Sequence, residues 1–234
     1  MLIDDIMLDV KAAKERDPAA HSTLEVLLLY QGVHALIAHR FAHWLYERRL
    51  FFSARLLSQI SRFLTGIEIH PGAKLGRGIL IDHGSGVVIG ETAEVGDNCT
   101  IYQGVTLGGI GTKKGKRHPT LGKNVTVGAG AKILGSFEVG DNCTIAANAV
   151  LLKPLQNDIT VAGVPAKPVR IAGVAVEKKP HAYSADLGKL QDKIYLLERR
   201  LEMLEKLEKQ SAAVQERQSG ELPDEGKKRE TDKH

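Results

Sequence analysis

A histidine that follows an aspartate is the first candidate for chemistry in this sequence. His83 lies in the segment Asp82–Gly86, where three small residues after it would let a ligand approach the backbone. Glu68 lies fifteen residues earlier. A carboxylate beside one imidazole nitrogen fixes the tautomer and stabilises the imidazolium, which leaves the other nitrogen to act as a base near neutral pH. We therefore expect His83 to be a general base with Glu68 as its partner. A surface histidine in a turn is the alternative.

The second candidate segment is Arg117-His118-Pro119, which closes a glycine-rich stretch. An arginine can hold a carboxylate through two parallel hydrogen bonds. His118 could donate to a carboxylate or to a developing oxyanion. Gly108 and Gly109 would let a ligand lie flat against the chain. A solvated basic loop would account for the lysines nearby.

The elements that must position these residues follow a six-residue rhythm, in which an aliphatic residue opens each unit and a small residue tends to lie four places on. This period is typical of a parallel β-helix, in which three short strands close one triangular coil and the openers share a core. An antiparallel sandwich would repeat every 8 to 12 residues instead. The openers are Ile69, Leu75, Ile81, Ile89, Val95, Ile101, Leu107, Leu121, Val127, Ile133, Val139, Ile145 and Leu151.

The rhythm is interrupted twice, and both candidate segments lie at the interruptions. The step from Ile81 to Ile89 is 8, and the step from Leu107 to Leu121 is 14, which we interpret as two units plus two residues. Solenoid insertions gather on one face and often build a binding surface. We therefore expect an excursion loop at 108–120. Cys99 and Cys143 share one repeat position, so we expect them to pack in the core rather than to form a disulfide, a nucleophile or a zinc site.

Different patterns precede and follow the solenoid, which we place at 66–175. Residues 1–65 have apolar residues at helical spacing, with Asp17 and Pro18 at a helix boundary and Asp17 as a cap. Apolar residues at 187, 190, 194, 197, 201 and 204 predict a heptad helix over 184–212, which could self-associate or fold back on the solenoid. The charged tail at 213–234 is expected to be disordered.

The overall composition limits the classes of protein to which this sequence can belong. Hydrophobic residues make up 43% and aromatic residues only 5%, which suits a narrow core of small aliphatics. The net charge of +4 is mild, and no basic and aromatic pattern indicates nucleic-acid binding. The sequence has neither a signal peptide nor a run of 18 apolar residues, so we expect a soluble, cytoplasmic protein with no membrane partner.

Several strings together resemble one known family, the bacterial serine O-acetyltransferases within the hexapeptide-repeat acyltransferases. The resemblance spans about residues 16 to 167. The joined Asp-His-Gly and Arg-His-Pro motifs are more specific than the repeats alone. The strings are Arg16-Asp17-Pro18, His43-Trp44, Ile69-His70-Pro71-Gly72-Ala73, Ile81-Asp82-His83-Gly84, Gly90-Glu91-Thr92, Tyr102-Gln103-Gly104-Val105-Thr106-Leu107-Gly108-Gly109 and Arg117-His118-Pro119.

The resemblance implies a left-handed β-helix that transfers acetyl from acetyl-CoA to L-serine in cysteine biosynthesis. It assigns the base to His83 and its partner to Glu68, where many members have Asp. It implies that Asp17 and Asp82 hold the substrate ammonium, and that Arg117 and His118 contact the substrate carboxylate and the reacting centre. It also implies that CoA binds near Gly108, Gly109, Ala129 and Ala147.

Partners follow from the same resemblance. It implies a homotrimer with clefts between neighbours, a dimer of trimers as the larger alternative, and L-cysteine as a feedback inhibitor. The region before Asp17 is shorter than in members whose N-terminal helices join two trimers. Many members end in an isoleucine that enters cysteine synthase, and this sequence ends in Thr231-Asp232-Lys233-His234, so we do not expect that complex.

Other functions remain as alternatives. An acetyltransferase for another amino acid or a sugar would use the same scaffold. A zinc-dependent carbonic anhydrase would need a third histidine shortly after His118, but position 123 is Lys, so no metal is expected. A non-catalytic trimeric scaffold held by the heptad helix would show no activity to lose when His83 is replaced.

Overall fold

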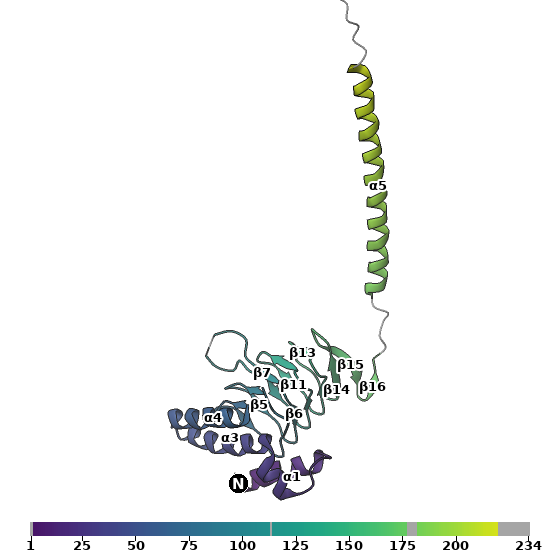
Figure 1. Ribbon diagram of the computed structural model, residues 1–234. Coiled ribbons are helices and arrows are strands. Elements are labelled where there is room, and N and C mark those ends of the chain that lie inside the picture. Colours follow the sequence, from purple (N-terminus) through teal and green to yellow (C-terminus); the bar gives the residue numbers. More distant parts are fainter. Residues whose placement is uncertain (1, 113, 177–181, 220–234) are drawn as a thin grey trace, which may run out of the picture. The chain divides into compact units, whose positions relative to one another are not determined.

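Stacked triangular coils of short strands form most of the first of two units in this computed structural model, which describes residues 2–112, 114–176 and 182–219 (Figure 1). The chain divides into two units, at residues 1–177 and 178–234. The first unit holds four helices and the strands, and the second holds one long helix. Because the strands pair in parallel from coil to coil, the fold is a parallel β-helix, as the six-residue period predicts.

Each face of the β-helix is one sheet. In spatial order, the first sheet contains β1 (Glu68–Ile69), β4 (Val88–Ile89), β7 (Thr106–Gly108), β10 (Lys132–Leu134) and β13 (Val150–Leu151). The second contains β11 (Glu138–Val139), β8 (Thr120–Leu121), β5 (Glu94–Val95) and β2 (Lys74–Leu75). The third contains β16 (Val174–Ala175), β15 (Lys167–Ile171), β14 (Ile159–Ala162), β12 (Thr144–Ile145), β9 (Thr126–Val127), β6 (Thr100–Tyr102) and β3 (Leu80–Asp82). Only the β14–β15 and β15–β16 pairs of these sheets are antiparallel, and they end the stack.

The strand register confirms the repeat and corrects one part of it. Aliphatic openers stand opposite one another on successive coils, as in the pairs Ile69 with Ile89 and Ile89 with Leu107. Leu107 pairs with Ile133 on the next coil, whereas Leu121 pairs with Val95 on another face. The 14-residue step is therefore one unit with eight inserted residues, and not two units plus two. All the inserted residues lie at a single corner.

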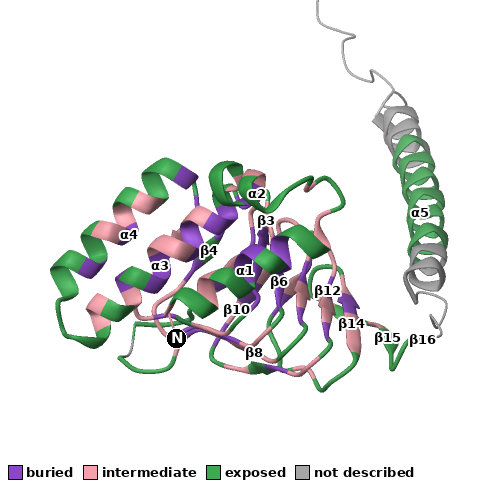
Figure 2. Cartoon of the chain, turned by 90° about the horizontal axis from the view of Figure 1, so that it is seen from below, coloured by how far each residue is buried: buried purple, intermediate pink, exposed green. Residues whose placement is uncertain are grey.

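The core is built from the two repeat positions that the period singles out (Figure 2). Every opener except Leu75 is buried, and Leu75 packs against the same core. The position four places on is fully buried in most units, where it is small or aliphatic, and Cys99 and Cys143 occupy it as free thiols. The exceptions are Ser85 and Gly111, which are exposed at the two interruptions, and Phe137 and Leu155, which are partly buried. Burial raises the pKa of the Cys99 thiol to about 11, so it stays protonated. Each buried aliphatic side chain stabilises the stack by roughly 1.5–3 kcal/mol.

Asparagines with positive φ turn the chain at one corner. Asn98, Asn124 and Asn142 have φ of 60°, 55° and 57°, a region that Asn tolerates better than most residues. Their side chains form a ladder, in which Asn124 donates to Asn142 at 3.0 Å and Asn142 donates to Asp158 at 2.9 Å. The asparagine at this repeat position therefore supplies the turn on each of the three coils, and Asn124 and Asn142 also bond to the next coil.

Four helices precede the coils: α1 (Leu2–Arg16), α2 (Thr23–Leu29), α3 (Gln31–Glu47) and α4 (Phe51–Thr65). Ser22 caps α2 by accepting from the N–H of Glu25 at 3.1 Å, and Gly66 ends α4 in the left-handed conformation. The boundary expected at Asp17 and Pro18 is present because α1 ends at Arg16, but Asp17 does not cap the next helix.

A buried ion pair ties the helices to the first coil. Arg40 on α3 contacts Asp9 on α1 at 2.7 Å and donates to the carbonyl of Gly76 at 2.8 Å. The other oxygen of Asp9 accepts from the N–H of Ile79 at 3.0 Å. Burial raises the pKa of Asp9, and the hydrogen bond and charge of Arg40 oppose that rise. These contacts fix α1, and therefore the segment that follows it, against the solenoid.

The second unit is the helix α5 (Ala182–Ser219). Helix continues to Ser219, where a disordered tail was expected from 213, because residues 211–219 contain strong helix formers such as Ala, Gln, Glu and Arg. The rest of that expected tail, residues 220–234, lies outside the described residues. Among the described helices, none combines the length and apolar character needed to cross a membrane.

Candidate active site

The first group of candidate residues lies at the corner between the third and first sheets, here called the His83 corner (83–87, 103–105, 128–131 and 146–149). His83 follows β3 with φ of 58°, and its side chain is 77% exposed. Its imidazole Nε2 lies 4.0 Å from a carboxylate oxygen of Asp82. The two-residue slip in the repeat therefore bends the backbone at His83 and presents the imidazole outwards.

Asp17 and Tyr30 add a second carboxylate to this corner. The Tyr30 hydroxyl donates to Asp17 at 2.6 Å, and the N–H of Ala19 donates to its other oxygen at 2.8 Å. These hydrogen bonds, helped by the charge of His83, lower the pKa of Asp17. The same contact raises the pKa of Tyr30 to about 12, with a smaller contribution from Asp82. Asp17 and Asp82 thus form an acidic site that faces the histidine.

Glu68 is not paired with His83 in the part of the chain that the structure describes. Its two carboxylate oxygens lie 3.2 Å from Arg55 and 3.4 Å from Arg62, both on α4. The backbone nevertheless brings the two segments together, because Gly84 lies so close to Ile67 that a side chain at Gly84 would collide with it. The expected dyad is therefore absent, since the longer glutamate side chain reaches the arginines of α4 instead.

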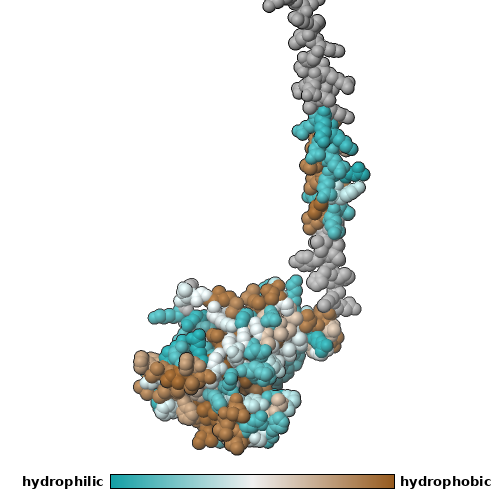
Figure 3. All heavy atoms as spheres, in the orientation of Figure 1, coloured by the Kyte–Doolittle hydropathy of each residue, from teal (hydrophilic) through white to brown (hydrophobic). Residues whose placement is uncertain are grey.

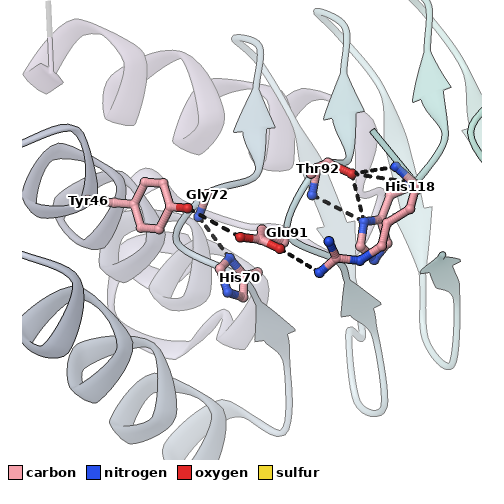
Figure 4. A network of polar contacts seen from close by, with 7 residues as sticks. Tyr46, His70, Gly72, Glu91, Thr92 and His118 are labelled. Atoms are coloured by element: carbon pink, nitrogen blue, oxygen red, sulfur yellow. Dashed lines mark hydrogen bonds and ion pairs between the residues drawn. The ribbon is translucent and has the colours of Figure 1, made fainter. Parts of the chain in front are cut away.

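The second group lies at the corner between the first and second sheets, here called the Arg117 corner (70–73, 90–93 and 109–119). The Arg117 guanidinium donates to Glu91 at 2.5 Å, and the Tyr46 hydroxyl donates to the other oxygen at 3.3 Å (Figure 4). Burial opposes ionisation of Glu91, but the hydrogen bond from Arg117 and the charge of His70 outweigh it and lower the pKa of Glu91. Arg117 is thus held in one orientation by a carboxylate.

Thr92 holds the imidazole of His118 at this corner. The N–H of Thr92 lies 3.2 Å from Nδ1 of His118, and the Thr92 hydroxyl lies 2.9 Å from the same nitrogen. The hydroxyl oxygen also accepts from the backbone N–H groups of Arg117 and His118 at 3.0 and 3.2 Å. A nitrogen that accepts from a backbone N–H carries no proton, so the proton of neutral His118 is on Nε2.

The surroundings of His118 keep the ring neutral and in place. Burial, the charge of Arg117 and that of Lys116 lower the pKa of His118 against the opposing effect of Glu91. Burial likewise lowers the pKa of nearby His70. The ring fills space that exists only because residue 90 is glycine, and Gly109 also lies against Nε2. His118 is therefore placed as a neutral hydrogen-bond donor.

A pocket of about 340 Å³ opens beside Glu91 at the Arg117 corner, lined by Tyr46, Phe51, Arg55, His70, Pro71 and Glu91. The lining combines the aromatic rings of Tyr46 and Phe51 with the charged side chains of Arg55 and Glu91. Groups of both charges are therefore available to a small polar molecule in this pocket.

The four residues expected at the cofactor divide between the two corners. Ala129 and Ala147 lie at the His83 corner, where the N–H of Asn148 donates to the carbonyl of Ala129 at 2.8 Å. Gly108 ends β7, and Gly109 lies against Arg117 and His118. Together the four residues line both edges of the first sheet rather than one continuous patch.

The two corners are at opposite ends of the strands of the first sheet. The strands between them are two or three residues long, so at ~3.3 Å per residue the corners are separated by roughly 10 Å. One copy therefore brings together Asp17, Asp82 and His83 at one corner and Glu91, Arg117 and His118 at the other. It does not bring the base and the guanidinium to one point.

Sequence reasoning missed the residues that hold the functional side chains. Tyr30, Tyr46 and His70 carried no assigned role, and neither did Glu91 and Thr92 within Gly90-Glu91-Thr92. Glu91 and Thr92 could have been found by writing the repeats in three columns, one for each face of the β-helix. That alignment places them at the same corner as Arg117, one coil earlier.

Comparison with known proteins identifies similar chains. Family models described as serine acetyltransferase, N-terminal, and bacterial transferase hexapeptide (six repeats) match residues 1–38 and 118–153. A Helicobacter pylori serine acetyltransferase is 61% identical over 167 residues, which cover 70% of this chain and 98% of the relative. A Neisseria gonorrhoeae serine acetyltransferase solved in complex with serine is 43% identical, with a TM-score of 0.70, covering 72% of this chain and 69% of that one. A serine acetyltransferase solved in complex with cysteine is 42% identical, with a TM-score of 0.71, covering 72% and 70%.

Proposed function

This chain belongs to the serine acetyltransferase family of acyltransferases, and we propose that it transfers acetyl from acetyl-CoA to the hydroxyl of L-serine, giving O-acetyl-L-serine and CoA. The observation that carries the proposal is the 61% identity to the Helicobacter pylori enzyme over 98% of its length. The reaction supplies the activated serine from which cysteine is made.

The polar groups at the two corners complement the three groups of serine. Asp17 and Asp82 are anionic and suit its ammonium, and Arg117, oriented by Glu91, suits its carboxylate. His118 presents its Nε2–H as a donor to the carboxylate or to the developing oxyanion. The exposed imidazole of His83 is left for the hydroxyl.

His83 acts as the general base in this proposal. It accepts the hydroxyl proton of serine as the serine oxygen attacks the thioester carbonyl carbon, and it returns that proton to the CoA sulfur as the carbon–sulfur bond breaks. Glu68 stabilises the imidazolium after its side chain turns from Arg55 and Arg62 towards His83. Direct transfer is preferred because both cysteines are buried in the core.

The separation of the two corners makes a neighbouring copy part of the proposal. We propose a homotrimer in which the His83 corner of one copy faces the Arg117 corner of the next, because neither corner alone holds both the base and the carboxylate clamp. Acetyl-CoA then lies between copies, beside Ala129 and Ala147 of one and Gly108 and Gly109 of the other. A dimer of such trimers remains the larger alternative.

L-Cysteine is the proposed feedback inhibitor. It differs from serine only by a thiol in place of the hydroxyl, so the groups that hold the ammonium and carboxylate would bind it equally well. The serine acetyltransferase solved with cysteine shows that a similar protein binds this amino acid.

Release of the CoA thiol with serine as acceptor tests the proposal. We expect serine-dependent release in the full chain, a loss of at least ~100-fold in His83→Ala because general base catalysis typically contributes that much, and unchanged release in His21→Ala. His21 is an apt control because it is exposed and, among the residues that the structure describes, contacts Glu25 on the surface. Release that serine does not stimulate, but another amino acid or a sugar does, would reassign the acceptor.

A further inference from the structure

Helix α5 carries an apolar seam that matches no role in the proposed reaction. In the view of Figure 3, apolar residues run along one edge of the helix beside polar ones. Within the second unit the residues of the seam are between 53% and 61% exposed from Leu190 to Leu204. They are Leu190, Ile194, Leu197, Leu201 and Leu204, which alternate steps of four and three. This spacing is that of the a and d positions of a coiled coil.

The charges beside the seam show which partner it fits. Counting Ile194 and Leu201 as a positions places Lys193 and Arg200 at g, and Glu198 and Glu205 at e. In a parallel, in-register coiled coil, each g residue faces the e residue of the following heptad on the neighbouring helix. Lys193 would face Glu198 of the neighbouring copy, and Arg200 would face Glu205 of the neighbouring copy. Every one of these contacts joins opposite charges.

The same charges disfavour an antiparallel pair. In that arrangement g residues face g residues and e residues face e residues, so Lys193 and Arg200 would meet each other across one side. Glu198 and Glu205 would meet across the other side. Like charges at such positions destabilise a pair, and the pattern therefore selects the parallel orientation of identical helices.

The length of one relative indicates that a serine acetyltransferase can lack this helix. The matched 167 residues make up 98% of the Helicobacter pylori relative. The first unit of this chain alone spans residues 1–177, so that relative has no room for a helix like α5. A family member can therefore have the first unit without such a helix, which favours a role for the seam in assembly.

We propose that the α5 helices of neighbouring copies of this chain form a parallel, in-register coiled coil over residues 187–204. The occupant of the seam is the same seam on another copy. This coiled coil orients the copies with their α5 helices pointing the same way, which is the arrangement that a cyclic assembly requires. The inference does not depend on which acceptor the enzyme acetylates.

Site-specific disulfide formation in the full chain tests this arrangement. In a parallel coiled coil the two copies of Leu204, at a d position near one end of the seam, lie side by side, whereas in an antiparallel pair they lie at opposite ends. Leu204→Cys should give a covalent dimer under mild oxidation, and Lys206→Cys, on the outer face, should not. The native cysteines do not interfere because both are buried. Leu204 and Lys206 are both exposed on α5 in the second unit, so neither substitution should disturb the folding of the first unit.

Two results would overturn the proposal. The absence of a covalent dimer in Leu204→Cys would show that the seam packs elsewhere, for example on the first unit of its own chain. Equal dimer formation in both variants would show random collision rather than a coiled coil.

A charge exchange provides the second measurement. In the Leu204→Cys background, Glu198→Lys with Glu205→Lys makes every flanking position basic, and Lys193→Glu with Arg200→Glu makes every one acidic. Each set alone should lose most of the disulfide, and co-expression of the two should restore it as a mixed dimer. A disulfide yield that is the same with and without these charge substitutions would contradict the proposed register.

Discussion

Thr92 fixes the tautomer of His118, because the Thr92 N–H donates to Nδ1 at 3.2 Å and the Thr92 hydroxyl lies 2.9 Å from the same atom. The hydroxyl oxygen also accepts two backbone N–H groups, so a single side chain shapes the Arg117 corner. The proton of His118 is consequently on Nε2, the nitrogen that faces Gly90 and Gly109. In our account, Thr92 is a positioning residue and His118 is the donor.

Replacing Thr92 should lower turnover without abolishing it. Thr92→Val removes the hydroxyl and keeps the backbone N–H, so His118 keeps one of its two contacts at Nδ1. We expect kcat to fall by less than the ~100-fold typical of deleting a charge-stabilising donor, and Thr92→Ser to restore it. Nitrogen NMR of His118 should show an Nε2-protonated ring in the parent and in the valine variant, because the backbone N–H of residue 92 still donates to Nδ1. A kcat in Thr92→Val equal to that of the parent would remove the positioning role of the hydroxyl.

The two carboxylates nearest His83 should have separable effects. Glu68→Gln should lower kcat with little change in the KM for serine, because the imidazolium that forms at His83 loses its proposed partner. Asp82→Asn should chiefly raise the KM for serine, because Asp82 is proposed to hold the ammonium. If kcat instead falls in Asp82→Asn and not in Glu68→Gln, the carboxylate 4.0 Å from His83 is its true partner.

Acid should destabilise the protein through His39. Burial lowers the pKa of His39 to about 3, with smaller contributions from the charges of His43 and Arg40. Below its ordinary value of 6.5 the unfolded chain therefore binds a proton that the folded chain does not. The free energy of unfolding should fall as pH drops from 6.5 towards 3. Denaturant titrations at several pH values should show that the free energy of unfolding falls less steeply with decreasing pH in His39→Gln than in the parent. His21→Gln, the control, should show the same pH dependence as the parent.

The ion pair between Asp9 and Arg40 should matter more to stability than any surface pair. Arg40→Ala leaves a buried carboxylate without its cation, which typically costs about 3–5 kcal/mol of unfolding free energy. Lys11→Ala breaks an exposed pair with Glu15 and should cost less than ~1 kcal/mol. Comparable losses in the two variants would mean that the buried pair does not anchor α1.

The period of the sequence predicts most of the fold because each repeat contributes the same two buried side chains. Every opener except Leu75 is buried, although the insertion between Leu107 and Leu121 was divided wrongly. Spacing alone cannot decide whether a 14-residue step contains one repeat unit and eight inserted residues or two repeat units and two inserted residues. The pairing of Leu121 with Val95 decides it, and that pairing is a contact between coils.

The candidate residues themselves were predictable, but their surroundings were not. Asp17 looked like a helix cap and instead binds Tyr30, which the end of α2 brings beside it. Glu68 looked like the partner of His83 and instead contacts two arginines of α4, a helix whose placement the sequence did not specify. Side-chain orientation depends on how helices dock on the first coil, and no local pattern encodes that docking.

Complementation between two inactive variants tests the shared site most directly. His83→Ala and Arg117→Ala are each expected to be inactive, and they damage different corners. If neighbouring copies share each site, co-expression in equal amounts should restore about a quarter of the parental rate of CoA release, because a random cyclic assembly pairs an intact His83 corner with an intact Arg117 corner at that frequency. A mixture no more active than the separate variants would contradict the account.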